Sequence, residues 1–121
     1  MCPPDGSPEH RGAARRSARE LAILRSLAPH TRAHAVALLG VHPALVVTSG
    51  RRSPRRNREV GGSPTSFHLE GRAVDLDGPL PLLQAAADTA WSQRISAACT
   101  GPEEVLLEGV HVKGEHLHVA W

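Results

Sequence analysis

The stretch Ser66–Asp75 constrains the fold of this chain more than any other segment. It reads SFHLEGRAVD, so His68 and Asp75 lie on either side of Gly71. On a straight strand the two residues would be roughly 23 Å apart and on opposite faces, and on a helix they would be about 10 Å apart. Neither element brings both side chains onto one metal ion. We therefore expect the chain to reverse near Gly71, where glycine provides the backbone freedom of a tight turn.

The C-terminal run Gly114–Trp121 provides candidates for a third ligand. His116 and His118 are separated by one apolar residue, so they share one face of a short strand. Residues 72–77 alternate in the same way and predict another strand. Two imidazoles and one carboxylate form a usual catalytic zinc set, which leaves a fourth position for water. The sequence thus predicts a metal site on a sheet.

Three segments then follow one another in a recognisable order. They are the run VVTSGRRS, which ends at Ser53, the Ser-x-His-x-x-Gly-x-Ala-x-Asp pattern from Ser66 to Asp75, and the closing His-x-His. Together they resemble the M15-type zinc D-Ala-D-Ala carboxypeptidase family, over about residues 44–121. The resemblance implies a peptidoglycan peptidase with one zinc ion per chain. The implied zinc ligands are His68, Asp75 and His118.

The same resemblance leaves two candidates for the catalytic base. Some family members use an acid three residues before the last zinc histidine, here Glu115, and others a histidine two before it, here His116. In a regular strand His116 shares the face of His118, whereas Glu115 points away unless the strand begins after it. We favour Glu115, because a carboxylate is the more common base beside zinc, and retain His116 as the alternative base or a substrate contact.

Further site residues come from the segments before the zinc motif. Arg52 aligns with the arginine of the family's Ser-Gly-Tyr-Arg motif, and its planar charge suits an oxyanion or a substrate carboxylate. Arg51 stands where the family usually has an aromatic residue, which changes the packing of this loop. By the same resemblance, Arg51, Ser66 and Asn57 are substrate-binding positions. As bare residues, Ser and Asn are ordinary turn formers.

The remaining sequence predicts an α+β domain, in which helices pack on one side of a small antiparallel sheet that carries the zinc site. Ser17 and Glu20 form a capping box, and Pro29 is expected to break the helix that follows. The predicted elements are a helix over 17–27, a helix from Arg32 to Leu39 closed by Gly40, a strand over 45–48, a surface loop over 51–65, a strand over 72–76, a helix over 80–95, and strands over 104–108 and 116–121.

Domain organisation and location follow from composition. Residues 1–16 are rich in Pro, Gly and Arg without periodicity, which predicts a flexible N-terminal lead before a zinc peptidase domain over 17–121. The first twenty residues lack the apolar core of a secretory signal, and no run approaches the roughly 18 apolar residues of a membrane span. We expect a monomer that is cytoplasmic when made. It would act on the cell wall after release or as part of a phage particle.

Two other classes of protein deserve comparison. The arginines of residues 51–58 could form a nucleic-acid patch, but stacking aromatics are missing around them and the net charge is only +2. We therefore expect a solvated loop and no nucleic-acid partner, with the peptidoglycan stem peptide as substrate. The alternative to an enzyme is a non-catalytic zinc-binding module of the cell wall or the virion.

Overall fold

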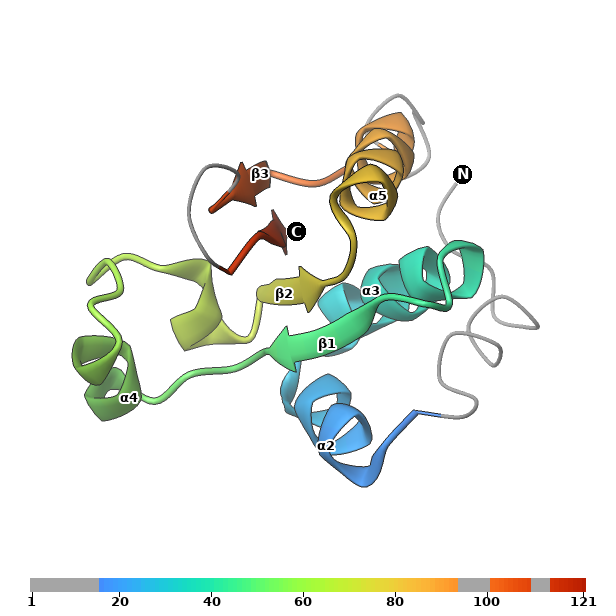
Figure 1. Cartoon of the computed structure of the whole chain (residues 1–121). Helices are drawn as coiled ribbons and strands as arrows, with labels where there is room; N and C mark the ends of the chain where they lie inside the picture. The colour runs from blue at the N-terminus through green and yellow to red at the C-terminus, as the bar shows by residue number, and fades with distance from the viewer. Residues whose placement is uncertain (1–15, 94–100, 110–113) are drawn as a thin grey trace.

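The computed structural model describes residues 16–93, 101–109 and 114–121. Residues 1–15 of the predicted lead, the end of the helix predicted over 80–95, and most of the last turn lie outside the described residues. The elements are α2 (Ala18–Ser26), α3 (Pro29–Val41), β1 (Val46–Ser49), α4 (Pro54–Glu59), the 3-10 turn η1 (Phe67–Glu70), β2 (Ala73–Asp77), α5 (Leu80–Gln93), β3 (Glu104–Glu108) and β4 (His116–Ala120). Figure 1 shows their arrangement.

The four strands form one antiparallel sheet in the order β1-β2-β4-β3. Side chains on its inner face are apolar and buried, as Val74 and Leu76 of β2 and Leu117 and Val119 of β4 show. This face packs against α2, α3 and α5, whose leucines and alanines complete the core. The predicted α+β class is therefore confirmed. The opposite face carries the intervening residues, because strand side chains alternate.

The capping box predicted at the start of α2 is confirmed, since the Ser17 side chain accepts a hydrogen bond from Glu20 N–H and the Glu20 carboxylate accepts one from Ser17 N–H.

Both boundaries of the second helix differ from the prediction. The helix begins at Pro29 and ends at Val41, so Gly40 lies inside it. Proline is suited to the first helical position, where its missing N–H would have no helical partner. Pro29 thus starts α3 rather than only ending α2.

The segment predicted as a loop over 51–65 contains the short helix α4, so that prediction is wrong in part. The Ser53 side chain caps the helix by accepting a hydrogen bond from Arg56 N–H, and Pro54 occupies the first turn. Six residues are too few for a periodic apolar stripe, so sequence periodicity could not reveal α4. Figure 1 shows α4 apart from α2, α3 and α5, on the side of the sheet where the chain leaves β1.

Glu20 connects α2 to the sheet. Its Oε2 accepts hydrogen bonds from Val47 N–H and the Arg16 guanidinium, both at 3.0 Å. Burial raises the pKa of the Glu20 carboxyl, but these hydrogen bonds and the Arg16 charge outweigh burial, so the pKa lies below its usual range. The stabilisation is therefore present above the unfolded pKa and is lost as pH falls through the folded pKa.

We expect Glu20→Gln to lower the free energy of unfolding by about 1–3 kcal/mol near neutral pH, because partly buried hydrogen bonds to a charged acceptor are weakened. The difference from the wild type should shrink in acid, where the wild-type carboxyl is also protonated. Urea unfolding at the two pH values measures both effects. Glu59→Gln is the control, since the ion pairs of Glu59 with Arg55 and Arg56 are exposed. An equal loss in both variants would contradict the prediction.

Among the residues that the structure describes, no helix has the length and apolar character needed to cross a membrane.

Candidate metal centre

The turn η1 positions His68. The Ser66 side chain accepts a hydrogen bond from His68 N–H, which begins the turn. Gly71 ends it in the left-handed region at φ 69°, a conformation that glycine adopts without a steric penalty. The chain then enters β2, which carries Asp75. The predicted reversal near Gly71 is therefore present, and it places the two side chains of the motif together.

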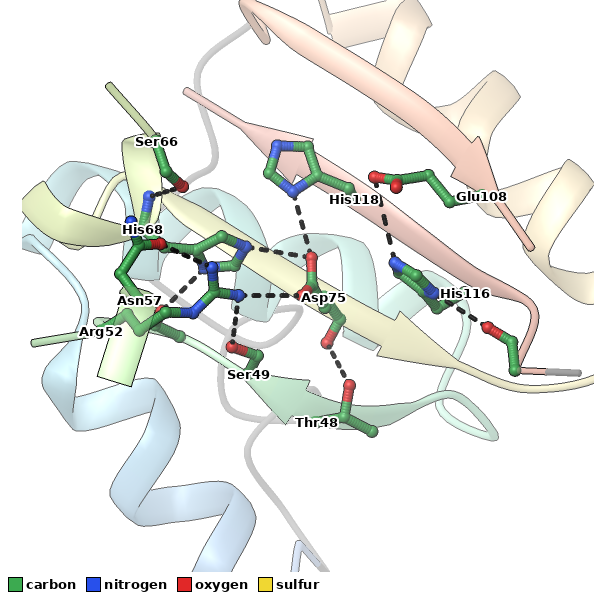
Figure 2. A network of polar contacts seen from close by, with 12 residues as sticks. Thr48, Ser49, Arg52, Asn57, Ser66, His68, Asp75, Glu108, His116 and His118 are labelled. Carbon is green, nitrogen blue, oxygen red and sulfur yellow. Dashed lines mark hydrogen bonds and ion pairs between the residues drawn. The ribbon is translucent and has the colours of Figure 1, made fainter. Parts of the chain in front are cut away.

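Three side chains converge above the outer face of the sheet (Figure 2). Asp75 of β2 lies directly opposite His118 of β4 in the strand register. The Asp75 Oδ1 atom is 3.1 Å from His68 Nε2 and 3.1 Å from His118 Nδ1. One ligand atom from each residue lies within 4.8 Å of the other two, and both imidazoles are buried. The structure thus brings together the three predicted metal ligands.

The outer nitrogens of the two imidazoles also have partners. His68 Nδ1–H donates to the carbonyl oxygen of Gly50 at 2.8 Å, and His118 Nε2–H donates to Glu104 Oε1 at 2.8 Å. Each ring therefore faces two acceptors, whereas a neutral imidazole carries one N–H. The two inner nitrogens then direct lone pairs at Asp75 unless each ring holds a second proton. A divalent cation among the three inner atoms removes this conflict, so the donor set fits zinc.

The close contacts in the metal site shift the pKa values of Asp75 and His118 in opposite directions. Burial raises the pKa of the Asp75 carboxyl, but hydrogen bonds from His118 and His68 and their charges outweigh burial and hold that pKa well below its usual range. Burial lowers the pKa of His118, yet hydrogen bonds to Asp75 and Glu104 and the two negative charges raise it overall. A proton on His118 Nδ1 competes with a metal ion for the lone pair of that nitrogen.

Arg52 lies beside the three side chains. Its Nη2 atom is 3.7 Å from Asp75 Oδ2, and its Nη1 atom donates to Asn57 Oδ1 at 3.0 Å. Asn57 is 3% exposed, and its Nδ2 atom donates to the carbonyl oxygen of Ser63. The buried Asn57 side chain therefore fixes the orientation of the Arg52 guanidinium. Arg51 points elsewhere, since its Nε atom donates to the carbonyl oxygen of Ser26.

A cleft of about 800 Å³ opens over the metal-site residues. It is lined by Arg52, Val60, Gly61, Gly62, Ser63, Thr65, Ser66, Phe67, His68, Asp75, Glu104, Leu106, Glu108, His116 and His118. Ser66, Arg52 and His116 thus border this cleft, whereas Asn57 and Arg51 are not among its lining residues. Of the three predicted substrate-binding residues, only Ser66 therefore lines the main cleft.

A smaller cavity of about 210 Å³ also borders Asp75. It is lined by Thr48, Asp75, Asp77, Gly114, Glu115 and His116. Glu115 borders this cavity and not the main cleft, whereas His116 borders both. The His116 ring is held by Gly114, whose carbonyl oxygen lies 3.0 Å from Nδ1. Both candidates for the base therefore line a cavity that Asp75 also lines.

Sequence reasoning missed Glu104, which contacts His118 and lines the main cleft. Glu104 lies on β3 next to β4, two positions from the residue opposite His118. No local spacing links the two residues. Only the pairing of strands β3 and β4 could have indicated this contact.

A family model described as Peptidase M15 matches residues 15–120. The matched region includes His68, Asp75 and His118, together with every residue that lines either cavity. No curated protein matches the chain.

Proposed function

The chain belongs to the peptidase M15 family, and from this premise we propose that it is a zinc-dependent peptidase that hydrolyses peptide bonds of peptidoglycan. The proposed activity is of the D-Ala-D-Ala carboxypeptidase or endopeptidase type, with the stem peptide as substrate. The observation that carries the proposal is the convergence of His68, Asp75 and His118 at the floor of an open cleft. A structural zinc site would be closed by protein ligands, whereas this one faces a cleft large enough for a peptide.

His68 Nε2, Asp75 Oδ1 and His118 Nδ1 would hold the zinc ion. When bound, zinc activates a water molecule for attack and polarises the scissile carbonyl. The chain's own residues then determine orientation and proton transfer. The hydrogen bond from His68 Nδ1–H to the Gly50 carbonyl oxygen holds that ring with Nε2 facing inward.

The remaining roles are assigned to charged groups around the metal site. Arg52 borders the cleft and would stabilise negative charge that develops on the substrate, because its planar guanidinium is held in place by Asn57. Glu115 would accept the proton of the attacking water and pass it to the leaving amine. His116 is the alternative base, and Ser66 contacts the substrate at the edge of the cleft.

The experiment that tests the proposal combines metal analysis with product analysis. Elemental analysis of purified protein should give about one zinc per chain, as expected for three protein ligands and one open position. Purified peptidoglycan and its soluble fragments are then incubated with the protein, and mass spectrometry identifies new peptide ends. Loss of a terminal D-alanine indicates a carboxypeptidase, and separation of cross-linked peptides indicates an endopeptidase. Chelator should stop the reaction and added zinc should restore it.

If the protein cleaves intact cell walls to which it is added from outside, the proposal extends to a lytic role, after host lysis or on a phage particle. Zinc binding without cleavage of any peptidoglycan preparation would contradict the enzymatic proposal. It would instead support the non-catalytic wall-binding module, which cosedimentation with walls would reveal. Failure to bind zinc would contradict both.

We expect Arg52→Ala to reduce hydrolysis by about 10²- to 10³-fold, comparable to loss of one oxyanion-stabilising donor. Zinc content should not change, because Arg52 contacts Asp75 only through the outer oxygen Oδ2. Steady-state kinetics and elemental analysis measure the two quantities. Arg55→Ala is the matched control, since the Arg55 side chain is 85% exposed on α4 and pairs with Glu59. Equal activity in the Arg52 variant and the control would rule out this role.

A further inference from the structure

Glu104 forms a short hydrogen bond with one of the three metal-site residues. Within the described ranges, no other acidic residue from outside the metal site does so. Its Oε1 atom lies 2.8 Å from His118 Nε2. The two residues lie on the same face of neighbouring strands, because Leu106 is directly opposite His118 and Glu104 is two residues before Leu106. The contact therefore depends on the backbone pairing of β3 with β4.

This contact determines which nitrogen of His118 faces the metal site. A carboxylate only accepts hydrogen bonds, so Glu104 selects the tautomer with the proton on Nε2. In the neutral ring the lone pair of Nδ1 is then directed toward Asp75 Oδ1, 3.1 Å away. His68 shows the reverse arrangement, in which the Gly50 carbonyl takes the Nδ1 proton and Nε2 faces inward. The two rings thus present different nitrogens, each selected by a separate acceptor.

We propose that Glu104 is a positioning residue for the metal site, which orients His118 and strengthens it as a zinc ligand through the Nε2–H hydrogen bond. Carboxylate partners of this kind raise the basicity of a metal-bound imidazole and fix its ring orientation. The half-exposed Glu104 side chain forms no ion pair with an arginine or lysine within the described ranges, so its short contact is directed to His118 alone. Glu104 has this role only if the proposed zinc centre exists.

Strand β3 contains a matched control. Glu108 lies on the same face of the same strand and also lines the cleft. It faces His116 instead, at 3.9 Å between Oε1 and Nε2, which is too long for a hydrogen bond. Glu108→Gln therefore makes the same chemical change on β3 without touching His118.

The test measures zinc affinity by competition with a chromophoric chelator, using the metal alone and no substrate. We expect Glu104→Ala to weaken zinc binding by about 10- to 100-fold, as loss of an outer hydrogen-bond partner does elsewhere. Glu104→Gln should weaken it less, because the amide oxygen can still accept the Nε2–H bond but carries no charge. Glu108→Gln should bind zinc like the wild type.

A second readout separates positioning from general destabilisation. NMR of the zinc-loaded protein should show the His118 Nε2–H proton protected from solvent exchange in the wild type, and exchanging rapidly in Glu104→Ala. Wild-type affinity in both Glu104 variants would overturn the inference, and so would an equal loss in Glu108→Gln. If the wild type itself binds no zinc, the proposed function fails as well. If the wild type binds zinc and the Glu104 variants bind it with the same affinity, only the role of Glu104 is overturned.

Discussion

Replacing Asp75 by Asn should abolish stoichiometric zinc binding and, with it, all hydrolysis. Asp75 Oδ1 lies between the two inner imidazole nitrogens, and Oδ2 faces Arg52. This carboxylate therefore contacts both histidine ligands and the neighbouring arginine. Asparagine keeps the shape but removes the negative charge, and its amide oxygen is a poor ligand for zinc beside two neutral imidazoles. The loss of affinity should therefore exceed the roughly 10- to 100-fold effect of an outer partner.

Asp77→Asn is the control for this variant. Asp77 is two residues further along β2 and is exposed, and its Oδ1 accepts a hydrogen bond from Gly78 N–H. Elemental analysis and chelator competition measure zinc binding in both variants, and circular dichroism checks that both fold. A folded Asp75→Asn protein that keeps one tightly bound zinc per chain would show that the metal is held elsewhere.

The second large effect is expected at the base. Glu115→Gln should reduce hydrolysis by about 10²- to 10⁴-fold, the usual contribution of a positioned proton acceptor. Zinc affinity should stay at the wild-type value, because Glu115 is not among the three converging side chains.

His116→Gln provides the comparison that separates the two candidates. His116 borders both cavities and shares the strand face of His118, whereas Glu115 borders only the smaller cavity. If Glu115 is the base, the His116 variant should change KM more than kcat, as expected for a substrate contact. A large loss of kcat in His116→Gln, with near wild-type kcat in Glu115→Gln, would assign the base to His116.

The local parts of this protein could be predicted from short stretches of sequence. The capping box at Ser17, the alternation in β2 and β4, and the reversal at Gly71 each depend on a few neighbouring residues and are present in the structure. The resemblance to the M15 family, based on three short motifs, is confirmed by the family match. Short signals also misled: α4, with only six residues, was expected to be loop, and α3 begins at Pro29, before its predicted start at Arg32.

The residue types of the metal site, and the need for a turn between His68 and Asp75, follow from the order of residues alone. How the site is completed depends on the packing of the whole sheet. Asp75 and His118 are 43 residues apart, and the contact of His118 with Glu104 depends on how β3 is registered against β4. Turns and caps are decided by interactions over a few residues, which a sequence displays directly. Strand register is decided by burial of the whole inner face, which depends on α2, α3 and α5 together.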